Sequence, residues 1–303
     1  MARSSTTWKP GQSGNPNGRS KKTQRLNTKK PSLPKGLAGV AGMHGLKTML
    51  IQQVIEPLRT PADYERYGLN IPNGILLFGP PGCGKTYIAR CLAEEIGCYF
   101  KEAGPSTVGS KYMHEVAVNL SNLFKLAEEN APTILFFDEI DALLPSRRLL
   151  SLSDGTTAAA RIEEVCEFLK LLDSCAERKI FFIGATNEPS QLDKAAIRAG
   201  RLDKRIYVGP PDADARAEML RLHIGDRPAH ENLDFAVLAQ RLKGYSASDI
   251  RLLVDEAARI ALSHRMVITE GCLAVAIRLV PPSIDVDDEL RFKQFETRGI
   301  AFE

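Results

Sequence analysis

The stretch ILLFGPPGCGKTYIARCLAEEIG at residues 75–97 decides the fold of this chain. Its first residues, ILLFG, indicate a buried strand, and YIARCLAEEIG places Ile88, Leu92 and Ile96 on one helical face. GPPGCGKT (79–86) stands between them and satisfies the pattern G-x-x-x-x-G-K-[ST] in the strand, loop and helix context that this pattern requires. The alternative, a glycine-rich turn without a ligand, does not account for that context.

The residue types of this loop predict a site for nucleotide phosphates. Its glycines let backbone N–H groups curl round the β- and γ-phosphates, and the helix N-terminus adds a partial positive charge. Lys85 is expected to bridge β- and γ-oxygens, and the Thr86 hydroxyl to ligate Mg²⁺. The predicted cofactors are ATP and Mg²⁺, and the residues expected to hold them here are Gly79, Pro80, Pro81, Gly82, Cys83, Gly84, Lys85 and Thr86.

The rest of the chain predicts an α/β fold with a five-stranded parallel P-loop sheet flanked by helices, followed by a small all-helical lid domain. Short apolar runs at 75–79, 98–103, 133–139, 180–185 and 204–209 alternate with amphipathic helical patterns. After PPDAD (210–214) only helical patterns follow. We therefore expect a disordered basic tail at 1–36, a nucleotide-binding domain at 37–212, and a helical domain with a C-terminal helix at 213–303.

Acidic residues end the predicted strand ILFFDE (134–139), where packing gives no reason for them. Asp138 is expected to reach the Mg²⁺ shell through a water molecule, and Glu139 to act as general base on the attacking water. Asp141 stands at a loop start, where we interpret it as a helix cap or a supporting group rather than a catalyst.

A fourth predicted strand, in IFFIGATNEP, ends at Thr186 and Asn187. An asparagine at this edge of the sheet is placed to hold the attacking water or to respond to the γ-phosphate. The alternative is turn chemistry, because Asn-Glu-Pro is a good loop start.

The order GPPGCGKT, ILFFDEID, GATNEP, LDKAAIRAGRLDKRIYVGPPD and GYSASDI resembles the AAA family of AAA+ ATPases in the narrow sense, over about residues 38–282. That family holds katanin, spastin, the proteasomal ATPases and the membrane protease ATPases. The resemblance implies a stand-alone ATPase module that assembles as a homo-oligomer, a hexamer. It also implies that Arg198 and Arg201 are arginine fingers that reach ATP on the neighbouring subunit. The alternative is a solvated surface turn.

Two further segments carry family roles by resemblance. GYSASDI (244–250) is similar to the family's GxSGAD, with Ala247 where Gly is usual and Ser248 where Ala is usual. In relatives this helix start closes over ribose and adenine, and VAG (40–42) resembles the segment on the other side of adenine. The resemblance therefore implies nucleotide contacts from Val40, Gly42 and Ala247.

The segment GPSTVGSKYMHE aligns with the family's GPELLSKYVGE after one extra residue. The resemblance places Lys111, Tyr112 and Met113 at the positions that grip a polypeptide in the central pore of the ring, and His114 replaces the usual Gly. A tyrosine packed on its own domain is the alternative. Residues 147–161 are interpreted as a second pore loop.

Charge and composition limit which other functions the chain can have. Residues 1–36 carry nine Lys or Arg and no acid, which leaves 31 basic and 37 acidic residues in the remainder. No apolar run of membrane-spanning length and no signal-peptide core is present, so we expect a cytoplasmic protein without membrane contact. Six cysteines without paired spacing read as small buried residues, and the absence of HExxH excludes a zinc protease of that type.

Three functions remain open on the sequence. The first is a hexameric ATP-driven remodeller that acts on a protein substrate, with a HORMA-type or other dedicated partner or adaptor. The alternative is a nucleic-acid-associated ATPase that regulates a mobile-element or DNA-bound complex through the basic tail. The third is a nucleotide-locked scaffold without hydrolysis, against which Glu139 argues.

Overall fold

The computed structural model describes residues 36–69, 71–109, 115–150, 155–198 and 200–298. The predicted disordered tail lies outside these residues except for its last one, and so do the predicted pore-loop positions Lys111, Tyr112 and Met113.

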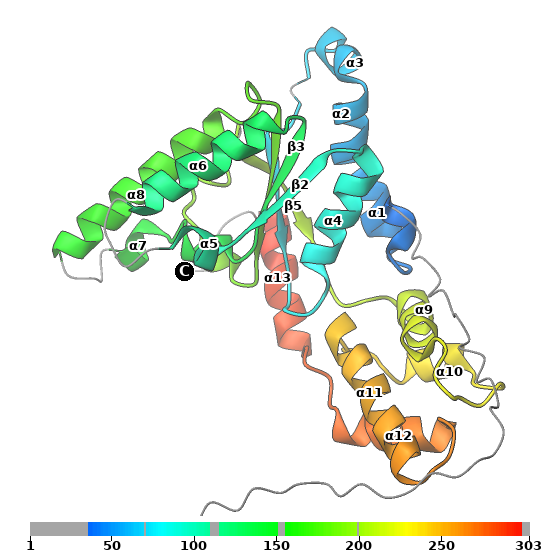
Figure 1. The fold of residues 1–303 in the computed structure, drawn as a ribbon. Helices are drawn as coiled ribbons and strands as arrows, with labels where there is room; N and C mark the ends of the chain where they lie inside the picture. The colour runs from blue at the N-terminus through cyan, green and yellow to red at the C-terminus, as the bar shows by residue number, and fades with distance from the viewer. Residues whose placement is uncertain (1–35, 70, 110–114, 151–154, 199, 299–303) are drawn as a thin grey trace, which may run out of the picture. The chain divides into compact units, whose positions relative to one another are not determined.

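The core of the fold is a five-stranded sheet with the order β2-β3-β4-β1-β5, in which every pairing is parallel (Figure 1). Strands β1 and β4 are aligned so that Phe78 lies opposite Thr186, and Phe78 also lies opposite Tyr207 of β5. The predicted sheet is confirmed. The strands are β1 (Gly74–Phe78), β2 (Tyr99–Ala103), β3 (Thr133–Phe137), β4 (Ile180–Thr186) and β5 (Leu202–Tyr207).

Helices connect the strands as parallel pairing demands. Before β1 come η1 (Gly36–Gly39), α1 (His44–Leu50), the π-helix η2 (Ile51–Ile55), α2 (Glu56–Arg59) and α3 (Pro61–Arg66). The connections between strands carry α4 (Lys85–Ile96), α5 (Pro105–Val108), α6 (Glu115–Glu129), η3 (Ile140–Ala142), α7 (Arg147–Leu150), α8 (Gly155–Asp173) and η4 (Pro189–Gln191).

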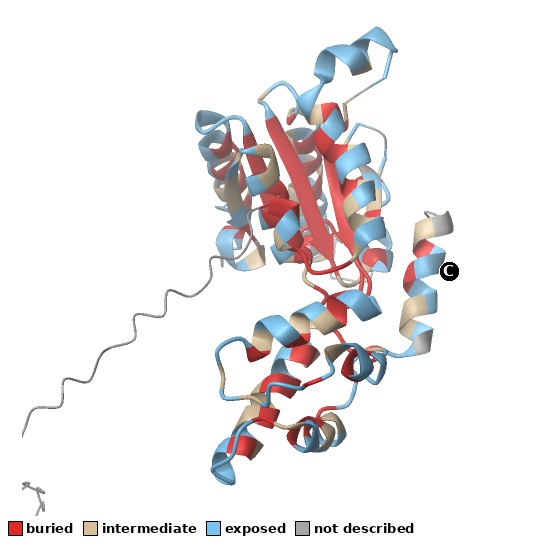
Figure 2. Cartoon of the chain, turned by 90° about the vertical axis from the view of Figure 1, so that its right-hand side faces the viewer, coloured by how far each residue is buried: buried red, intermediate tan, exposed pale blue. Residues whose placement is uncertain are grey.

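Successive residues of a strand point to opposite faces of the sheet, so each strand contributes to two hydrophobic cores, one on each face. Leu76 and Phe78 of β1 pack in one cluster with α6 and α8, whereas Ile75 and Leu77 pack in the other with α1, η2 and α4. Strands β1, β3 and β4 are buried at every residue, whereas the edge strand β2 is partly exposed, and Figure 2 shows buried strands between helices with exposed outer faces. A strand that is buried on both faces has to be apolar without alternation, which is why ILLF and ILFF are continuous hydrophobic runs.

Beyond β5 the described chain is helical, with α9 (Ala213–Ile224), α10 (Phe235–Gln240), α11 (Ala247–Ser263) and α12 (Glu270–Leu279) around a third core. Helix α11 begins at a capping box, in which the Ser246 hydroxyl accepts the Asp249 N–H and the Asp249 carboxylate accepts the Ser246 N–H. The last helix, α13 (Val286–Arg298), belongs to the sheet's core instead, because Phe295 lies 4.9 Å from Phe78 between ring centroids. The domain boundary near residue 212 stays a prediction.

None of the helices in the described ranges combines the length and the hydrophobicity that crossing a bilayer requires.

All six cysteines carry free thiols, and Cys83, Cys91, Cys175 and Cys272 are buried. Burial raises the pKa of the Cys83 and Cys175 thiols to about 12. These two thiols are therefore protonated and unreactive near neutral pH.

Candidate nucleotide site at the carboxyl edge of the sheet

The loop between β1 and α4 has a backbone that only glycine adopts easily. Gly79 has φ 148°, and a Cβ there would lie 2.2 Å from the Val208 carbonyl oxygen. Gly84 has φ 88° and directly precedes α4, and a Cβ there would meet no atom of the described residues within 4 Å. The first glycine is required by contact with the chain after β5. The second is required by its backbone conformation alone, and it leaves the start of α4 open.

Lys85, the first residue of α4, is folded back into this loop. Its Nζ donates to the Gly79 carbonyl at 2.8 Å, to the Pro80 carbonyl at 2.9 Å and to Asn187 Oδ1 at 2.6 Å. Only 6% of the residue is exposed, and this burial lowers the pKa of the ammonium. The three protons of this buried ammonium are shared among neutral oxygens. An anion that binds beside it would therefore stabilise its charged form.

Thr86 and Asp138 form the second polar contact of the edge. The Thr86 hydroxyl donates to Asp138 Oδ2 at 3.0 Å. Thr86 lies in the first turn of α4, and Asp138 follows the last residue of β3. A hydroxyl and a carboxylate on adjacent elements are oxygen donors of the kind that Mg²⁺ prefers.

Glu139 adopts a left-handed backbone conformation, with φ 50° and ψ 48°, that is uncommon for any residue except glycine. Its N–H donates to Asp138 Oδ1 at 3.0 Å, and its side chain is exposed. Such conformations cost about 1–3 kcal/mol and collect at functional sites. The kink therefore lies at the second of the two acids and turns the chain away from the direction of β3.

Asn187 is the third member of the cluster, since its Oδ1 accepts from Lys85. It follows Thr186, the fully buried last residue of β4, whose hydroxyl donates to Asp141 Oδ1 and accepts the Glu188 N–H at 2.9 Å. Of the two interpretations given to Asp141, a helix cap or a supporting group, the structure agrees with the second, because Asp141 lies inside η3 and contacts the neighbouring strand end. It is a supporting group at the edge.

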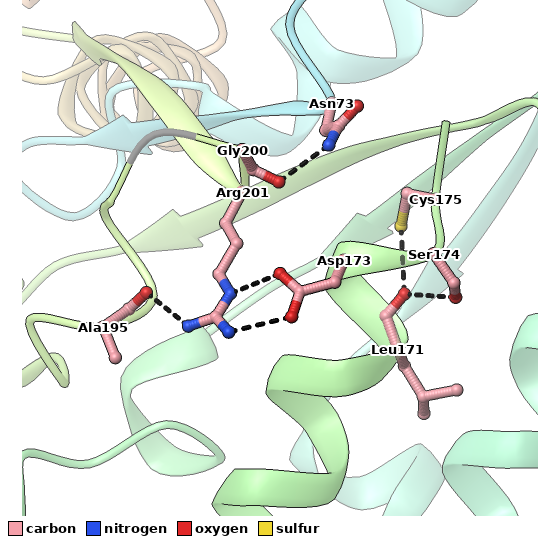
Figure 3. Close-up of polar contacts among 8 residues, drawn as sticks. All are labelled: Asn73, Leu171, Asp173, Ser174, Cys175, Ala195, Gly200 and Arg201. Atoms are coloured by element: carbon pink, nitrogen blue, oxygen red, sulfur yellow. Dashed lines mark hydrogen bonds and ion pairs between the residues drawn. The ribbon is translucent and has the colours of Figure 1, made fainter. Parts of the chain in front are cut away.

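The two predicted arginine fingers differ in their surroundings. Arg198 is exposed, and its guanidinium makes no hydrogen bond or ion pair with any residue that the structure describes. Arg201 is held within its own chain (Figure 3): Nε and one terminal nitrogen donate to the two Asp173 oxygens at 2.6 and 2.9 Å, and the other donates to the Ala195 carbonyl at 2.8 Å. The adjoining Gly200 carbonyl accepts from Asn73 at 2.7 Å.

The start of α11 touches the phosphate loop. The Ser248 N–H donates to the Gly82 carbonyl at 3.2 Å, and Ala247, half-buried, is the first residue of the helix. Ala247, for which a nucleotide contact is predicted, is therefore the neighbour in sequence of a residue that is hydrogen-bonded to the phosphate loop.

The segment expected to flank adenine is tied to two helices. Val40 and Gly42 are buried, and the Gly42 N–H donates to Glu218 Oε2 of α9 at 3.0 Å. The preceding Gly39 carbonyl accepts from the Tyr87 hydroxyl of α4 at 2.9 Å. The segment is thus anchored to the same helix that carries Lys85.

Sequence reasoning missed three participants. Asp173 ends α8, far from any motif, and nothing in its neighbourhood signals its pairing with Arg201. Glu218 of α9 carries no signal either. Ser248 did carry one, because it departs from the family pattern at a position that the structure places on the phosphate loop.

The residues at the carboxyl edge of the sheet fit ATP and Mg²⁺. They offer an ammonium whose pKa is lowered by burial, a glycine-lined helix start, and a hydroxyl with a carboxylate 3.0 Å away. Anions bind at helix N-termini, and hard cations bind oxygen donors. The residues present therefore match both parts of a magnesium nucleotide.

Comparison with known proteins gives the same assignment. Residues 75–210 match the family described as ATPase family associated with various cellular activities (AAA), and residues 232–268 match the AAA+ lid domain. Protein SAV of Sulfolobus acidocaldarius is 40% identical over 214 residues, which are 70% of this chain and 27% of that protein. The probable 26S proteasome regulatory subunit 10B of Caenorhabditis elegans is 36% identical over 247 residues, 80% of this chain and 60% of that protein.

A solved structure shares the architecture. The FIGL-1 AAA domain in complex with ADP superposes with a TM-score of 0.75 at 29% identity, covering 89% of this chain and 94% of the FIGL-1 chain. The chain spans less than two thirds of the length of the curated relatives named above. The two family matches together cover more than half of this chain, with the phosphate loop, both acids and Asn187 inside the first. The chain therefore belongs to the AAA+ ATPases, with an AAA module followed by an AAA+ lid.

Proposed function

We propose that this chain hydrolyses ATP at the carboxyl edge of its sheet and uses the cycle to remodel a protein substrate within a homo-hexameric ring. The observation that carries the proposal is the Lys85 contact with Asn187 at 2.6 Å beside the Thr86 contact with Asp138 at 3.0 Å. These contacts join the phosphate loop and the start of α4 to the chain after β4, which pairs with β1, and to the chain after β3, which lies beyond β4. Packing alone gives no reason to gather an ammonium, an amide and carboxylates there.

Each residue of the edge receives a role from its chemistry. Lys85 and the backbone N–H groups of the loop bind the β- and γ-phosphates, and Asn187 orients the γ-phosphate or the attacking water. Thr86 and, through water, Asp138 would hold Mg²⁺, which would neutralise charge on the phosphate oxygens. Glu139 accepts a proton from the attacking water as general base. Val40, Gly42 and Ala247 are proposed to line the base and ribose.

The arginines are proposed to complete the site of a neighbouring subunit. Arg198 is exposed and has no described partner, as a residue that acts in trans requires. Arg201 has to exchange the Asp173 carboxylate for phosphate oxygens before it takes the same part. A finger supplied in trans stabilises charge on the transferring group, which makes hydrolysis depend on assembly.

The decisive variant for hydrolysis is Glu139→Gln, which keeps the shape and removes the base. We expect ATP binding within about threefold of wild type and a fall in kcat of at least about a hundredfold. Glu129→Gln, the same exchange at an exposed residue of α6, is the matched control and leaves both unchanged. Turnover of Glu139→Gln at the wild-type rate would remove Glu139 from its role.

The remodelling part depends on the predicted pore residues Lys111, Tyr112 and Met113. Tyr112→Ala is expected to abolish unfolding of a tagged protein substrate while basal ATPase stays within about twofold. Tyr67→Ala removes a tyrosine that is 79% exposed on the described surface, and it serves as the control. Full remodelling by Tyr112→Ala would contradict the assignment. Proteins trapped by the Glu139→Gln form with ATP would identify a HORMA-type or other dedicated partner.

The second candidate function is regulation of a nucleic-acid-bound complex. It is favoured by the nine basic residues and no acid in residues 1–36. Deletion of that tail then abolishes binding to duplex DNA and DNA-stimulated ATPase. The remodelling proposal expects no DNA stimulation of the full chain, so the two are separated by one measurement.

A further inference from the structure

One hydrogen bond joins the two turns that carry the proposed catalytic groups. Asp141 stands in η3 two residues after Glu139, and Thr186 ends β4 directly before Asn187. The Thr186 hydroxyl donates to Asp141 Oδ1 and accepts the Glu188 N–H at 2.9 Å. The hydroxyl is therefore bonded on both sides, in a position where the residue has no exposed surface.

The chemistry of the two groups sets the direction of these bonds. A hydroxyl has one proton to donate, and an ionised carboxylate only accepts. Asp141 consequently draws the Thr186 proton toward itself and leaves a lone pair for the Glu188 N–H. That second bond spans two residues and closes a local side-chain turn with Asn187 at its centre. Without Asp141 the hydroxyl is free to rotate, and its lone pair is no longer held toward the Glu188 N–H.

Both turns need such a restraint. Glu139 holds a left-handed conformation at φ 50°, which persists only where its surroundings enforce it. Asn187 has to keep its amide 2.6 Å from Lys85. We propose that Asp141 and Thr186 are positioning residues, whose hydrogen bond fixes the Glu139 turn against the Asn187 turn so that base and amide face one phosphate together. The inference rests on the proposed ATPase function.

The test removes only the hydroxyl. Thr186→Val is expected to lower kcat by at least about tenfold while KM and the dissociation constant for ATP stay within about threefold, and Thr186→Ser restores kcat to within about twofold. Thr133→Val is the matched control: Thr133 is 1% exposed and donates to the Ala127 and Asn130 carbonyls, but at the amino end of β3. The Thr133→Val variant should be less stable than wild type but keep the wild-type kcat.

A measurement without turnover follows the turn itself. Hydrogen exchange of the Glu188 amide should accelerate in Thr186→Val and in Asp141→Ala, and stay as in wild type in Thr133→Val. The double variant Asp141→Ala with Thr186→Val should be no slower in kcat than the worse single variant, because one bond is removed either way.

The outcomes separate the inference from the function on which it rests. Equal kcat in Thr186→Val and Thr133→Val, with unchanged Glu188 exchange, overturns the inference even if Glu139→Gln is inactive. A wild-type chain without ATPase removes the proposed function, and the exchange experiment still decides whether the bond holds the turn. If Thr186→Val does not fold, Asp141→Ala decides, because Asp141 is only half-buried and its truncation is tolerated more easily.

Discussion

The sheet edge around Lys85 and the segment around Arg198 are two halves of one proposed site, and they are built differently. At the edge, Lys85, Thr86, Asp138 and Asn187 are bonded to one another or to the loop. In the arginine segment, Arg201 is bonded inside its own chain and Arg198 is exposed. One chain thus brings the residues of the proposed nucleotide-binding half together by itself, whereas Arg198 is exposed at its surface. The difference also indicates that the two arginines are not equivalent.

Lys85→Ala is expected to have the largest effect on the nucleotide-binding half. We expect no measurable ATP binding or hydrolysis, because the variant removes the ammonium that gathers two loop carbonyls and Asn187. Nucleotide titration monitored by fluorescence measures binding, and circular dichroism verifies folding. Lys125→Ala, at an exposed position of α6, is the control. ATP affinity retained by Lys85→Ala would show that the edge is not where phosphate binds.

The next effect is that of Arg198→Ala. A finger contributes about 10³–10⁵ in kcat, so we expect a loss of that order with ATP affinity and melting temperature unchanged. Lys85→Ala subunits still carry Arg198, and Arg198→Ala subunits still bind ATP. Mixing the two inactive variants should therefore recover part of the ATPase, measured as phosphate release. A mixture as inactive as its components would contradict a site shared between chains.

The sequence predicted that the side chains of the binding half meet at one edge of the sheet, and the reason is physical. Strand, glycine loop and helix are contiguous from Ile75 to Gly97, and each acid or amide follows a strand of the same parallel sheet. Parallel strands bring their carboxyl ends to one edge, so Lys85, Asp138 and Asn187 had to meet there. Local pattern and topology were sufficient.

The supporting contacts could not be predicted in the same way. Asp173 meets Arg201 because α8 ends beside the start of β5, and Thr186 meets Asp141 because η3 turns back on β4. Each pair depends on how a helix end or a turn packs, which periodicity does not encode. Asp141 was recognised as a supporting group, but its partner became visible only in three dimensions.

The smallest expected effect is on stability, and it concerns the pair of Arg201 and Asp173. The hydrogen bonds from Arg201 lower the pKa of Asp173 below its ordinary value of 3.8. A carboxylate whose pKa is lowered by folding stabilises the fold above that ordinary value, and the contribution disappears as the pH falls through the lowered pKa. Asp173→Asn should therefore cost less than about 1 kcal/mol at pH 7, since the pair is partly exposed, and the difference from wild type should close in acid.

Asp255→Asn is the matched control for this variant, because Arg227 likewise lowers the pKa of Asp255 through a 2.6 Å contact in the helical region. Urea unfolding at neutral and acidic pH measures both. If Arg201 mainly serves its own chain, both variants lose similar stability and keep ATPase within about twofold, since Arg201 retains the Ala195 carbonyl. A far larger ATPase loss in Asp173→Asn alone would show that Asp173 orients Arg201 for the neighbouring site, and the two arginines would then act as a pair.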